Sequence, residues 1–242
     1  MEGKSGRMAA LMRRLRPEMN GAVVEAMTAR GIVYPLSYGV AVPAIREGAA
    51  AFGPDHELAR LLYRQQVREL RLAGIYTADV EQLSPDELDF WARGVVNTEV
   101  AEHLAYALLG RTRWAGTVLF RWLGGDCPVP GKPEETRGGG AGLDTPRAEC
   151  LRYAALMTGA HALARGADGW DYDRLQALLP EACAQAVPAE TPAWTAFLGR
   201  MIRHAPQGRE RVRTFLADPR VAASPLFPRL DDEVSWQLDD TL

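Results

Sequence analysis

Hydrophobic residues recur at intervals of three and four positions along most of the chain, which is the period of an α-helix buried along one side. In residues 56–74, Leu58, Leu62 and Leu70 follow this spacing, and Gly74 supplies a stop signal. The same spacing predicts further helices over residues 9–30, 42–52, 97–109, 112–123, 146–165, 171–186, 192–205 and 208–217. No alternating strand pattern of useful length occurs, so the sequence predicts an all-α protein.

The predicted helices are short and are separated by Gly, Pro or Asp residues, which favours antiparallel neighbours. Ser84 followed by Glu87 predicts a capping box at the start of another helix over residues 84–96. Helix pairs of roughly forty residues each are compatible with an α-α superhelix, a solenoid of the HEAT/ARM type with a concave binding face. We expect one such domain over residues 1–242.

Two segments interrupt the helical pattern. Residues 124–145 combine prolines, a glycine run and charges, which predicts a flexible surface loop and not a domain linker. Residues 231–242 carry five acids and no base, which predicts a solvated end; docking through Trp236 is the alternative.

Composition narrows the classes of protein and site. The chain is 47% hydrophobic but has no run of eighteen apolar residues, and its first residues lack a signal peptide's apolar region. We therefore expect a soluble, cytoplasmic protein. The three cysteines and four histidines are widely spaced, so neither disulfides nor a metal site is expected. No cofactor-binding glycine motif occurs, because the GGGAG run at 138–142 lacks a flanking strand and helix.

Charge limits how the chain could bind a polyanion. The net charge of −3 gives no bulk attraction, so nucleic acid would need a local basic surface. All basic residues except Lys4 and Lys132 are arginines, which suits phosphate contacts but also follows from a GC-rich genome. Spacings of four, four and three positions predict that four arginines form a row along one side of the 56–74 helix: Arg60, Arg64, Arg68 and Arg71. This row either contacts a phosphate backbone or is a solvated face whose charges pair with acids such as Glu57 and Glu69.

Residues 97–108, NTEVAEHLAYAL, are the first candidate for chemistry. On a helix, one stripe holds Glu99, Glu102, His103 and Tyr106. A second stripe that can be buried holds Val100, Leu104 and Leu108. The polar stripe either faces water, as in any amphipathic helix, or faces a ligand.

Several segments resemble a known family when taken in order. LSYGVAVPAIREGAAAFGPDHELARLLYRQQVRELRLAG (36–74) resembles the N-terminal signature of the AlkD family of DNA alkylation-repair proteins. DELDFWARGVVNTEVAEHLAYALL, CLRYAALMTGAHALARG and FLGRMIRHAPQGRERVRTFL are similar to its later helical repeats. The resemblance covers most of residues 36–217.

That resemblance implies a curved stack of HEAT-like helix pairs whose concave face grips duplex DNA. Active members of the family are N-glycosylases that remove N3- or N7-alkylated purines. Such a purine is a good leaving group, and a carboxylate beside the sugar stabilises the positive charge that develops as the bond breaks. The resemblance implies no metal and no cofactor.

The family's site maps onto this chain with substitutions. Glu102 matches the catalytic aspartate, so the charge is kept on a longer side chain, and Glu99 could share its role. Thr98 replaces a tryptophan that lies against the DNA. Loss of this aromatic ring weakens cation–π recognition of a cationic base.

Three arginines fall at or beside further DNA-binding positions. Arg152 matches an arginine that contacts the DNA backbone. Arg200 replaces the second tryptophan of the family, and Arg203 lies beside it. Three hypotheses follow: a glycosylase that uses Glu102, a DNA-binding protein without glycosylase activity, or a HEAT-type scaffold that binds a protein.

Overall fold

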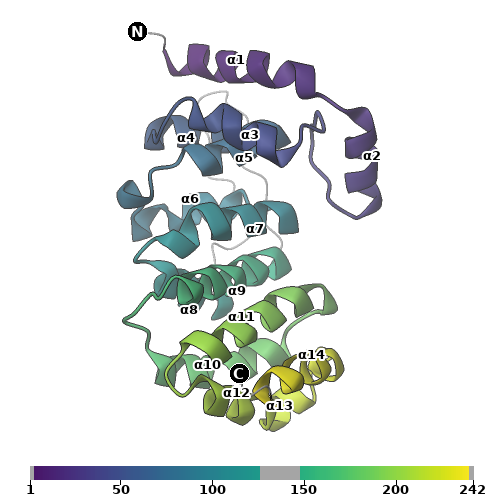
Figure 1. Ribbon diagram of the computed structural model, residues 1–242, viewed down its shortest axis with the longest axis vertical. Coiled ribbons are helices and arrows are strands. Elements are labelled where there is room, and N and C mark those ends of the chain that lie inside the picture. Colours follow the sequence, from purple (N-terminus) through teal and green to yellow (C-terminus); the bar gives the residue numbers. More distant parts are fainter. Residues whose placement is uncertain (1–2, 126–147, 240–242) are drawn as a thin grey trace. The chain divides into compact units, whose positions relative to one another are not determined.

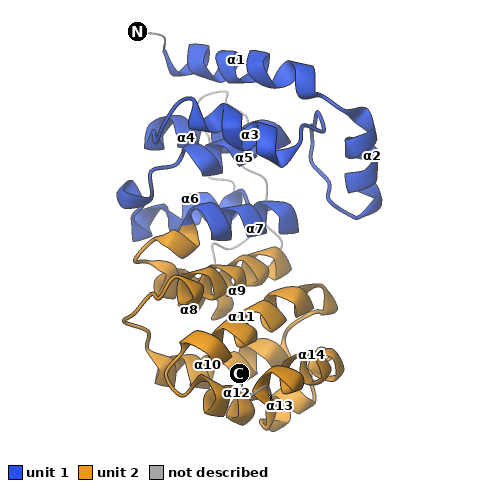
Figure 2. Cartoon of the chain, viewed as in Figure 1, with its two compact units in different colours: residues 1–108, 128–147 blue, residues 109–127, 148–242 orange. Residues whose placement is uncertain are grey.

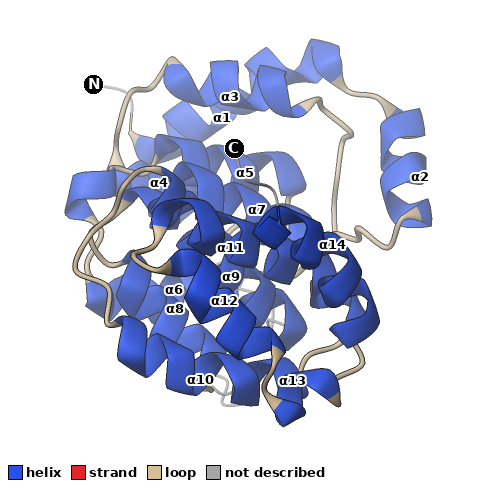
Figure 3. Ribbon diagram, turned by 60° about the horizontal axis from the view of Figure 1, so that its bottom comes forward, coloured by secondary structure: helices blue, strands red, loops and turns tan. Residues whose placement is uncertain are grey.

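The structure is a computed structural model that describes residues 3–125 and 148–239. Its secondary structure is helical in both ranges (Figure 3), and one isolated bridge pairs Leu36 with Val67. The prediction of an all-α protein is therefore confirmed. Most of the predicted 124–145 loop lies outside the described residues.

The chain divides into two compact units (Figure 2). The described part of unit 1 is residues 3–108, and that of unit 2 is residues 109–125 and 148–239. The organisation as one domain stays a prediction.

Unit 1 is built around the buried helix α5 (Figure 1). α5 packs against α3, α4 and α7, and α1 packs against α3 and α4. The α-helices of this unit are α1 (Lys4–Leu15), α2 (Gly21–Ala29), α3 (Val42–Ala50), α4 (His56–Tyr63), α5 (Arg68–Thr77), α6 (Leu88–Arg93) and α7 (Thr98–Ala107). Short 3-10 helices cover Arg16–Glu18, Val80–Gln82 and Pro85–Glu87.

A glycine permits the close approach of α4 and α5. A Cβ added at Gly74 would lie 2.7 Å from both the carbonyl oxygen of Ala59 and the backbone nitrogen of Tyr63. Nearby, the buried Tyr63 hydroxyl donates a 2.7 Å hydrogen bond to the carbonyl of Trp91. The glycine therefore brings two backbones together where a side chain would separate them.

Unit 2 is centred on the neighbouring helices α9 and α11. α8 packs on α9, while α12 and α14 pack on α11. The α-helices of this unit are α8 (Ala115–Leu123), α9 (Ala148–Ala164), α10 (Tyr172–Ala184), α11 (Thr191–His204), α12 (Gly208–Leu216), α13 (Pro219–Ala222) and α14 (Phe227–Asp239). Short 3-10 helices cover Leu109–Arg111 and Pro188–Glu190. The carbons of the Phe197 ring would lie as near as 2.7 Å to a Cβ added at Gly159, so α9 and α11 also pack closely.

The continuous helix expected over residues 56–74 is wrong, because the chain breaks between α4 and α5. Val67 is extended (φ −105°, ψ 121°) and pairs with Leu36, whose carbonyl accepts a 2.9 Å hydrogen bond from the Arg68 backbone. The break contains neither Gly nor Pro. A segment distant in sequence therefore stabilises it.

The predicted row of arginines is consequently wrong as well. Arg60 and Arg64 lie at the end of α4 and stack over the ring of Phe90. Arg68 and Arg71 lie at the start of α5 and are buried. Neither a phosphate-tracking row nor one solvated face exists.

Two smaller predictions are also wrong, the helix over residues 9–30 and the capping box of Ser84 and Glu87. The helix expected over residues 9–30 is interrupted after α1 by a 3-10 turn that contains Pro17 and by the extended Met19 and Asn20. Ser84 makes no capping hydrogen bond. The Glu87 carboxylate instead lies 2.9 Å from Nε2 of His56.

The acidic end of the chain is helical through Asp239, not a solvated tail. Val234 and Leu238 are buried along one side of α14, and this helix packs against α11 and α12 in spite of its acids. Trp236 is 59% exposed and does not dock. The apolar spacing within this short segment was the signal that outweighed its charge.

Candidate nucleic-acid interface

Helix α7 presents the predicted polar stripe because its other side is held in the core. Val100, Leu104 and Leu108 are buried, as the sequence predicts. The Asn97 side chain caps the helix by accepting a 3.0 Å hydrogen bond from the Val100 backbone. It also donates to the carbonyl of Val33 at 3.1 Å.

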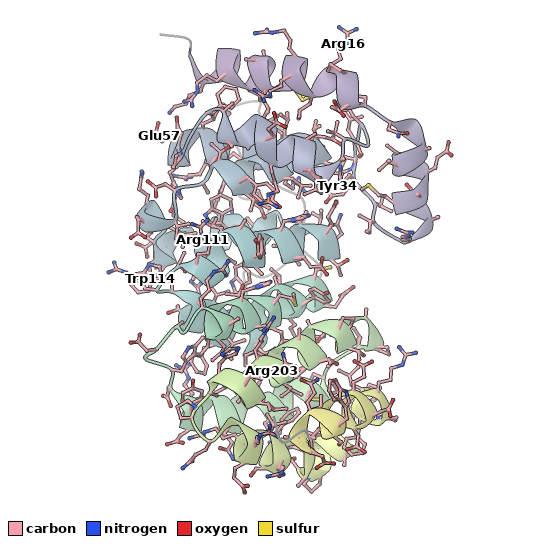
Figure 4. The ribbon with its side chains drawn as sticks, viewed as in Figure 1. Arg16, Tyr34, Glu57, Arg111, Trp114 and Arg203 are labelled. Carbon is pink, nitrogen blue, oxygen red and sulfur yellow. The ribbon has the colours of Figure 1, made fainter. Side chains whose placement is uncertain are left out.

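Glu99 faces a buried arginine and not a ligand. Arg68 donates two hydrogen bonds to the Glu99 carboxylate, at 2.9 Å from Nε and 2.6 Å from Nη2, and the Tyr34 hydroxyl donates a third at 2.6 Å. Burial would raise the pKa of Glu99, but the hydrogen bonds and charge of Arg68, with the Tyr34 hydroxyl, outweigh it and lower the pKa. Glu99 is thus an anion held within unit 1 by Arg68 and by Tyr34, and Tyr34 is labelled in Figure 4.

The same arginine ties an extended segment to α5. Arg68 donates to the Val40 carbonyl at 2.7 Å and lies 3.3 Å from Glu69. Glu69 is fully buried and accepts hydrogen bonds of 3.1 to 3.2 Å from the backbones of Tyr38 and Val40. Glu69 and Arg68 therefore satisfy backbone groups that would otherwise be buried without partners.

The far part of α7 carries the exposed members of the stripe. Glu102 and Tyr106 are exposed, and His103 is half-buried. The Tyr76 hydroxyl of α5 lies 2.7 Å from His103 Nδ1, and the Arg46 guanidinium of α3 lies 5.5 Å from the centre of the Tyr76 ring. Burial lowers the pKa of His103 against the raising effect of nearby Glu99 and Glu102, so the ring is neutral at pH 7.

These contacts show that α5 and α7 run parallel. Arg68 and Glu99 join the amino ends of the two helices, and Tyr76 and His103 join them farther along. Helices α3, α5 and α7 thereby place five polar or aromatic side chains close together: Arg46, Tyr76, Glu102, His103 and Tyr106.

In unit 2, α9 and α11 are also parallel. Arg152, near the start of α9, donates through Nε at 2.9 Å and through Nη2 to Glu190, which directly precedes α11. The Arg152 side chain is 18% exposed, whereas that of Glu190 is 1% exposed. Arg152 is therefore engaged by a buried acid but remains in contact with the surface.

A basic cluster lies at the other ends of α9 and α11. α9 and α11 pack against each other, with His161 near the end of α9, Arg165 directly after it and Arg200 near the end of α11. Burial lowers the pKa of His161, and the charges of Arg165 and Arg200 lower it further. Arg203, three positions after Arg200, donates a 2.8 Å hydrogen bond to the Gln237 side chain (Figure 4). The partner is neutral, so this contact leaves the arginine's charge uncompensated. We call His161, Arg165, Arg200 and Arg203 the basic cluster.

The predicted site residues fall into two groups. Thr98, Glu99 and Glu102 share α7 of unit 1. The three predicted arginines belong to unit 2, with Arg200 and Arg203 in the basic cluster and Arg152 at the opposite ends of the same helices. Sequence spacing could not reveal Tyr76 and Arg46, because they approach His103 only through the packing of three helices.

Other classes of site have no counterpart in the described residues. In residues 3–125 and 148–239, no three His, Cys, Asp or Glu side chains form a group that could hold a metal ion. No helix there has both the length and the apolar character needed to cross a membrane. Cys150 and Cys183 are buried.

Neither a known protein-family profile nor a curated protein sequence matches this chain. A solved structure is similar to it with a TM-score of 0.67 over 94% of each chain, at 15% sequence identity. That structure is described as "a new family of proteins related to the HEAT-like repeat DNA glycosylases with affinity for branched DNA structures". This chain has the same fold. The expectation of a HEAT-like helical solenoid is thus confirmed, and closer kinship to the AlkD family stays a prediction.

Proposed function

We propose that the protein binds DNA through the exposed faces of its parallel helices. The observation that carries this proposal is the basic cluster, which gathers arginines from two helices in a chain of net charge −3. A local concentration of guanidinium groups is what a protein without bulk positive charge needs to bind phosphates. The affinity of the similar HEAT-like protein for branched DNA supports DNA as the partner.

The salt dependence of binding tests the basic cluster. Replacing both Arg200 and Arg203 with alanine should weaken binding to unmodified duplex DNA and reduce the slope of log affinity against log salt by about 2, since each phosphate contact contributes about 0.9. Arg174→Ala is the matched control, because this exposed arginine stacks over Phe120 in another part of unit 2. An equal change of slope in the control variant would remove the basic cluster from the interface.

Arg152 needs a separate test because its removal also uncovers Glu190. We propose that it contacts the DNA backbone through the part of its guanidinium that reaches the surface. Arg152→Ala should then weaken binding and lower the salt slope by about 1. Glu190→Gln keeps the arginine and removes the competing charge, so it should bind DNA at least as tightly as the wild type. Equal losses in both variants would mean that the ion pair is purely structural.

A second candidate function is N-glycosylase activity on alkylated purines. The observation that favours it is that Glu102 is exposed on the same stripe as His103 and Tyr106, whereas Arg68 and Tyr34 hold Glu99. An exposed carboxylate near aromatic rings could stabilise positive charge on a sugar and a cationic base. Glu102 is thus the better choice for the family's catalytic position, and Glu99 is better suited to position α7.

Base release from methylated duplex DNA tests this activity. Wild type should release 7-methylguanine or 3-methyladenine, and Glu102→Gln should abolish the release while leaving DNA binding intact. Glu99→Gln would lower stability, so its activity is compared at a temperature where both variants are folded. DNA binding without release by the wild type would exclude the glycosylase. Absence of both would favour the protein-binding scaffold.

A further inference from the structure

An open hollow lies between α3 and the end of α5, within unit 1. Its volume is about 470 Å³, which is in the range of about 300–1,000 Å³ typical of small-molecule sites. It is lined by Pro43, Arg46, Glu47, Ala50 and Tyr76. The site residues predicted from the sequence include none of these five.

The lining combines a stacking surface with both signs of charge. The exposed Arg46 guanidinium lies over the Tyr76 ring, and Pro43 and Ala50 add small apolar walls. Glu47 is exposed and accepts a 2.7 Å hydrogen bond from Arg14, which fixes one of its oxygens. The Tyr76 hydroxyl is held by His103 Nδ1 at 2.7 Å, which restrains the ring.

This combination is better suited to a nucleobase than to a phosphate. Bases stack on aromatic rings and on guanidinium planes, whereas Glu47 would repel a phosphate. A carboxylate accepts hydrogen bonds from the exocyclic amino groups of adenine, cytosine and guanine, and thymine has no such group. The base must also be unpaired, because inside a duplex the neighbouring base pairs cover both of its faces and pairing occupies its amino group.

We infer that this hollow binds one unpaired nucleobase of a DNA strand, with the base stacked on the Arg46–Tyr76 pair and its amino group directed to Glu47. The inference rests on the proposed DNA-binding function for its biological role and names the feature of DNA that is recognised. Branched DNA offers such bases where its strands separate.

A free nucleoside tests the hollow without any DNA binding by the rest of the protein. Deoxyadenosine should shift the NMR signals of the His103 imidazole and the Arg46 Nε–H, and thymidine should bind more weakly. Arg46→Ala should weaken deoxyadenosine binding about tenfold or more, since stacking of one base is worth about 1–3 kcal/mol. Arg64→Ala is the matched control, because Arg64 is an exposed arginine of the same unit stacked over Phe90.

Two further variants separate stacking from hydrogen bonding. Tyr76→Phe keeps the ring and should retain most of the affinity, and Glu47→Gln should reduce the preference for deoxyadenosine over thymidine. If deoxyadenosine leaves the His103 and Arg46 signals unchanged at millimolar concentration, or if Arg64→Ala weakens binding as much as Arg46→Ala, the inference is wrong.

DNA with a single unpaired adenine links the hollow to the proposed function. Arg46→Ala should remove the preference for this DNA over a fully paired duplex, whereas Arg200→Ala with Arg203→Ala should weaken both equally. Binding of deoxyadenosine without any DNA binding would overturn the proposed function and leave the hollow as a nucleoside site. Binding of DNA without a response to deoxyadenosine would overturn only this inference.

Discussion

Units 1 and 2 use the same device to align two parallel helices, but they differ in how it is exposed. In each unit an arginine of one helix pairs with a glutamate at the amino end of the helix that runs parallel to it. These pairs are Arg68–Glu99, between α5 and α7, and Arg152–Glu190, between α9 and α11. Arg68 is 3% exposed and also contacts the fully buried Glu69, so the cation of this pair is buried inside unit 1, while its partner Glu99 is 13% exposed. Arg152 keeps contact with the surface. The ion pair of unit 1 therefore has a buried guanidinium and a structural role, whereas the ion pair of unit 2 leaves part of its guanidinium at the surface.

The opposite ends of these helix pairs differ in chemistry. In unit 1, the Tyr76 hydroxyl contacts His103 near the exposed Glu102. In unit 2, the charges near His161 are those of Arg165 and Arg200. Mixed polar and aromatic groups are suited to bases and sugars, and a cluster of cations is suited to phosphates. We therefore expect unit 1 to contact bases and sugars and unit 2 to contact phosphates.

The largest effect is expected from the buried cation of Arg68. Arg68→Met removes the charge that faces both Glu69 and Glu99, and it should lower the free energy of unfolding by about 3–5 kcal/mol because Glu69 stays fully buried and Glu99 stays largely buried without it. Urea unfolding measures this loss. The exposed Arg64 provides the control, and Arg64→Met should change stability by no more than about 0.5 kcal/mol. A loss below about 1 kcal/mol for Arg68→Met would show that water reaches the pair.

A smaller difference is expected between the two close-packed glycines. Gly74→Ala places a methyl group against the backbone of α4, which cannot move aside, and should destabilise the protein by about 1–3 kcal/mol. Gly159→Ala meets side chains and no backbone, with the Phe197 ring at 2.7 Å and Leu119 at 3.4 Å, and the gain in helix propensity of about 1 kcal/mol should offset much of its cost. Thermal unfolding of both variants ranks them. The reverse order would mean that the core of unit 2 is the more rigid one.

The smallest effect concerns pH. The pKa values of His103 and His161 are both lowered in the folded protein, so both favour folding above the unfolded value of about 6.5, and this stability is lost as the pH falls through their folded values. His103→Gln and His161→Gln should each flatten the loss of stability between about pH 7.5 and pH 5.

Salt distinguishes the two histidines because their neighbouring charges act in opposite directions. Screening removes the lowering effect of Arg165 and Arg200 on the pKa of His161, so the pH dependence left in His103→Gln should become shallower. For His103, the raising effects of Glu99 and Glu102 on the pKa are larger than the lowering effects of Arg68 and Arg46, so screening lowers this pKa and the dependence left in His161→Gln should become steeper. Denaturant unfolding at low and high salt measures both. Identical responses would contradict the assigned surroundings.

Most helices and their buried sides could be predicted from the sequence, because apolar spacing and capping residues act within a few positions of the chain. The exceptions are the helices expected over residues 9–30 and 56–74, which are each divided in two. It predicted a buried stripe of Val100, Leu104 and Leu108 beside a polar stripe that holds Glu102, and the structure confirms that the three apolar residues are buried. Apolar spacing also lies in α14, but the five acids of the last residues concealed it.

Only the tertiary structure decided which charges are internal and which face a partner. Leu36 interrupts the helix that local signals favour, and the interruption turns Arg68 into the core while Arg64 stays exposed. Glu99 and Glu102 are three positions apart on one stripe, yet only Glu99 meets the buried guanidinium. Burial of a charge depends on partners that come from distant segments, and the spacing of residues along one helix carries no information about them.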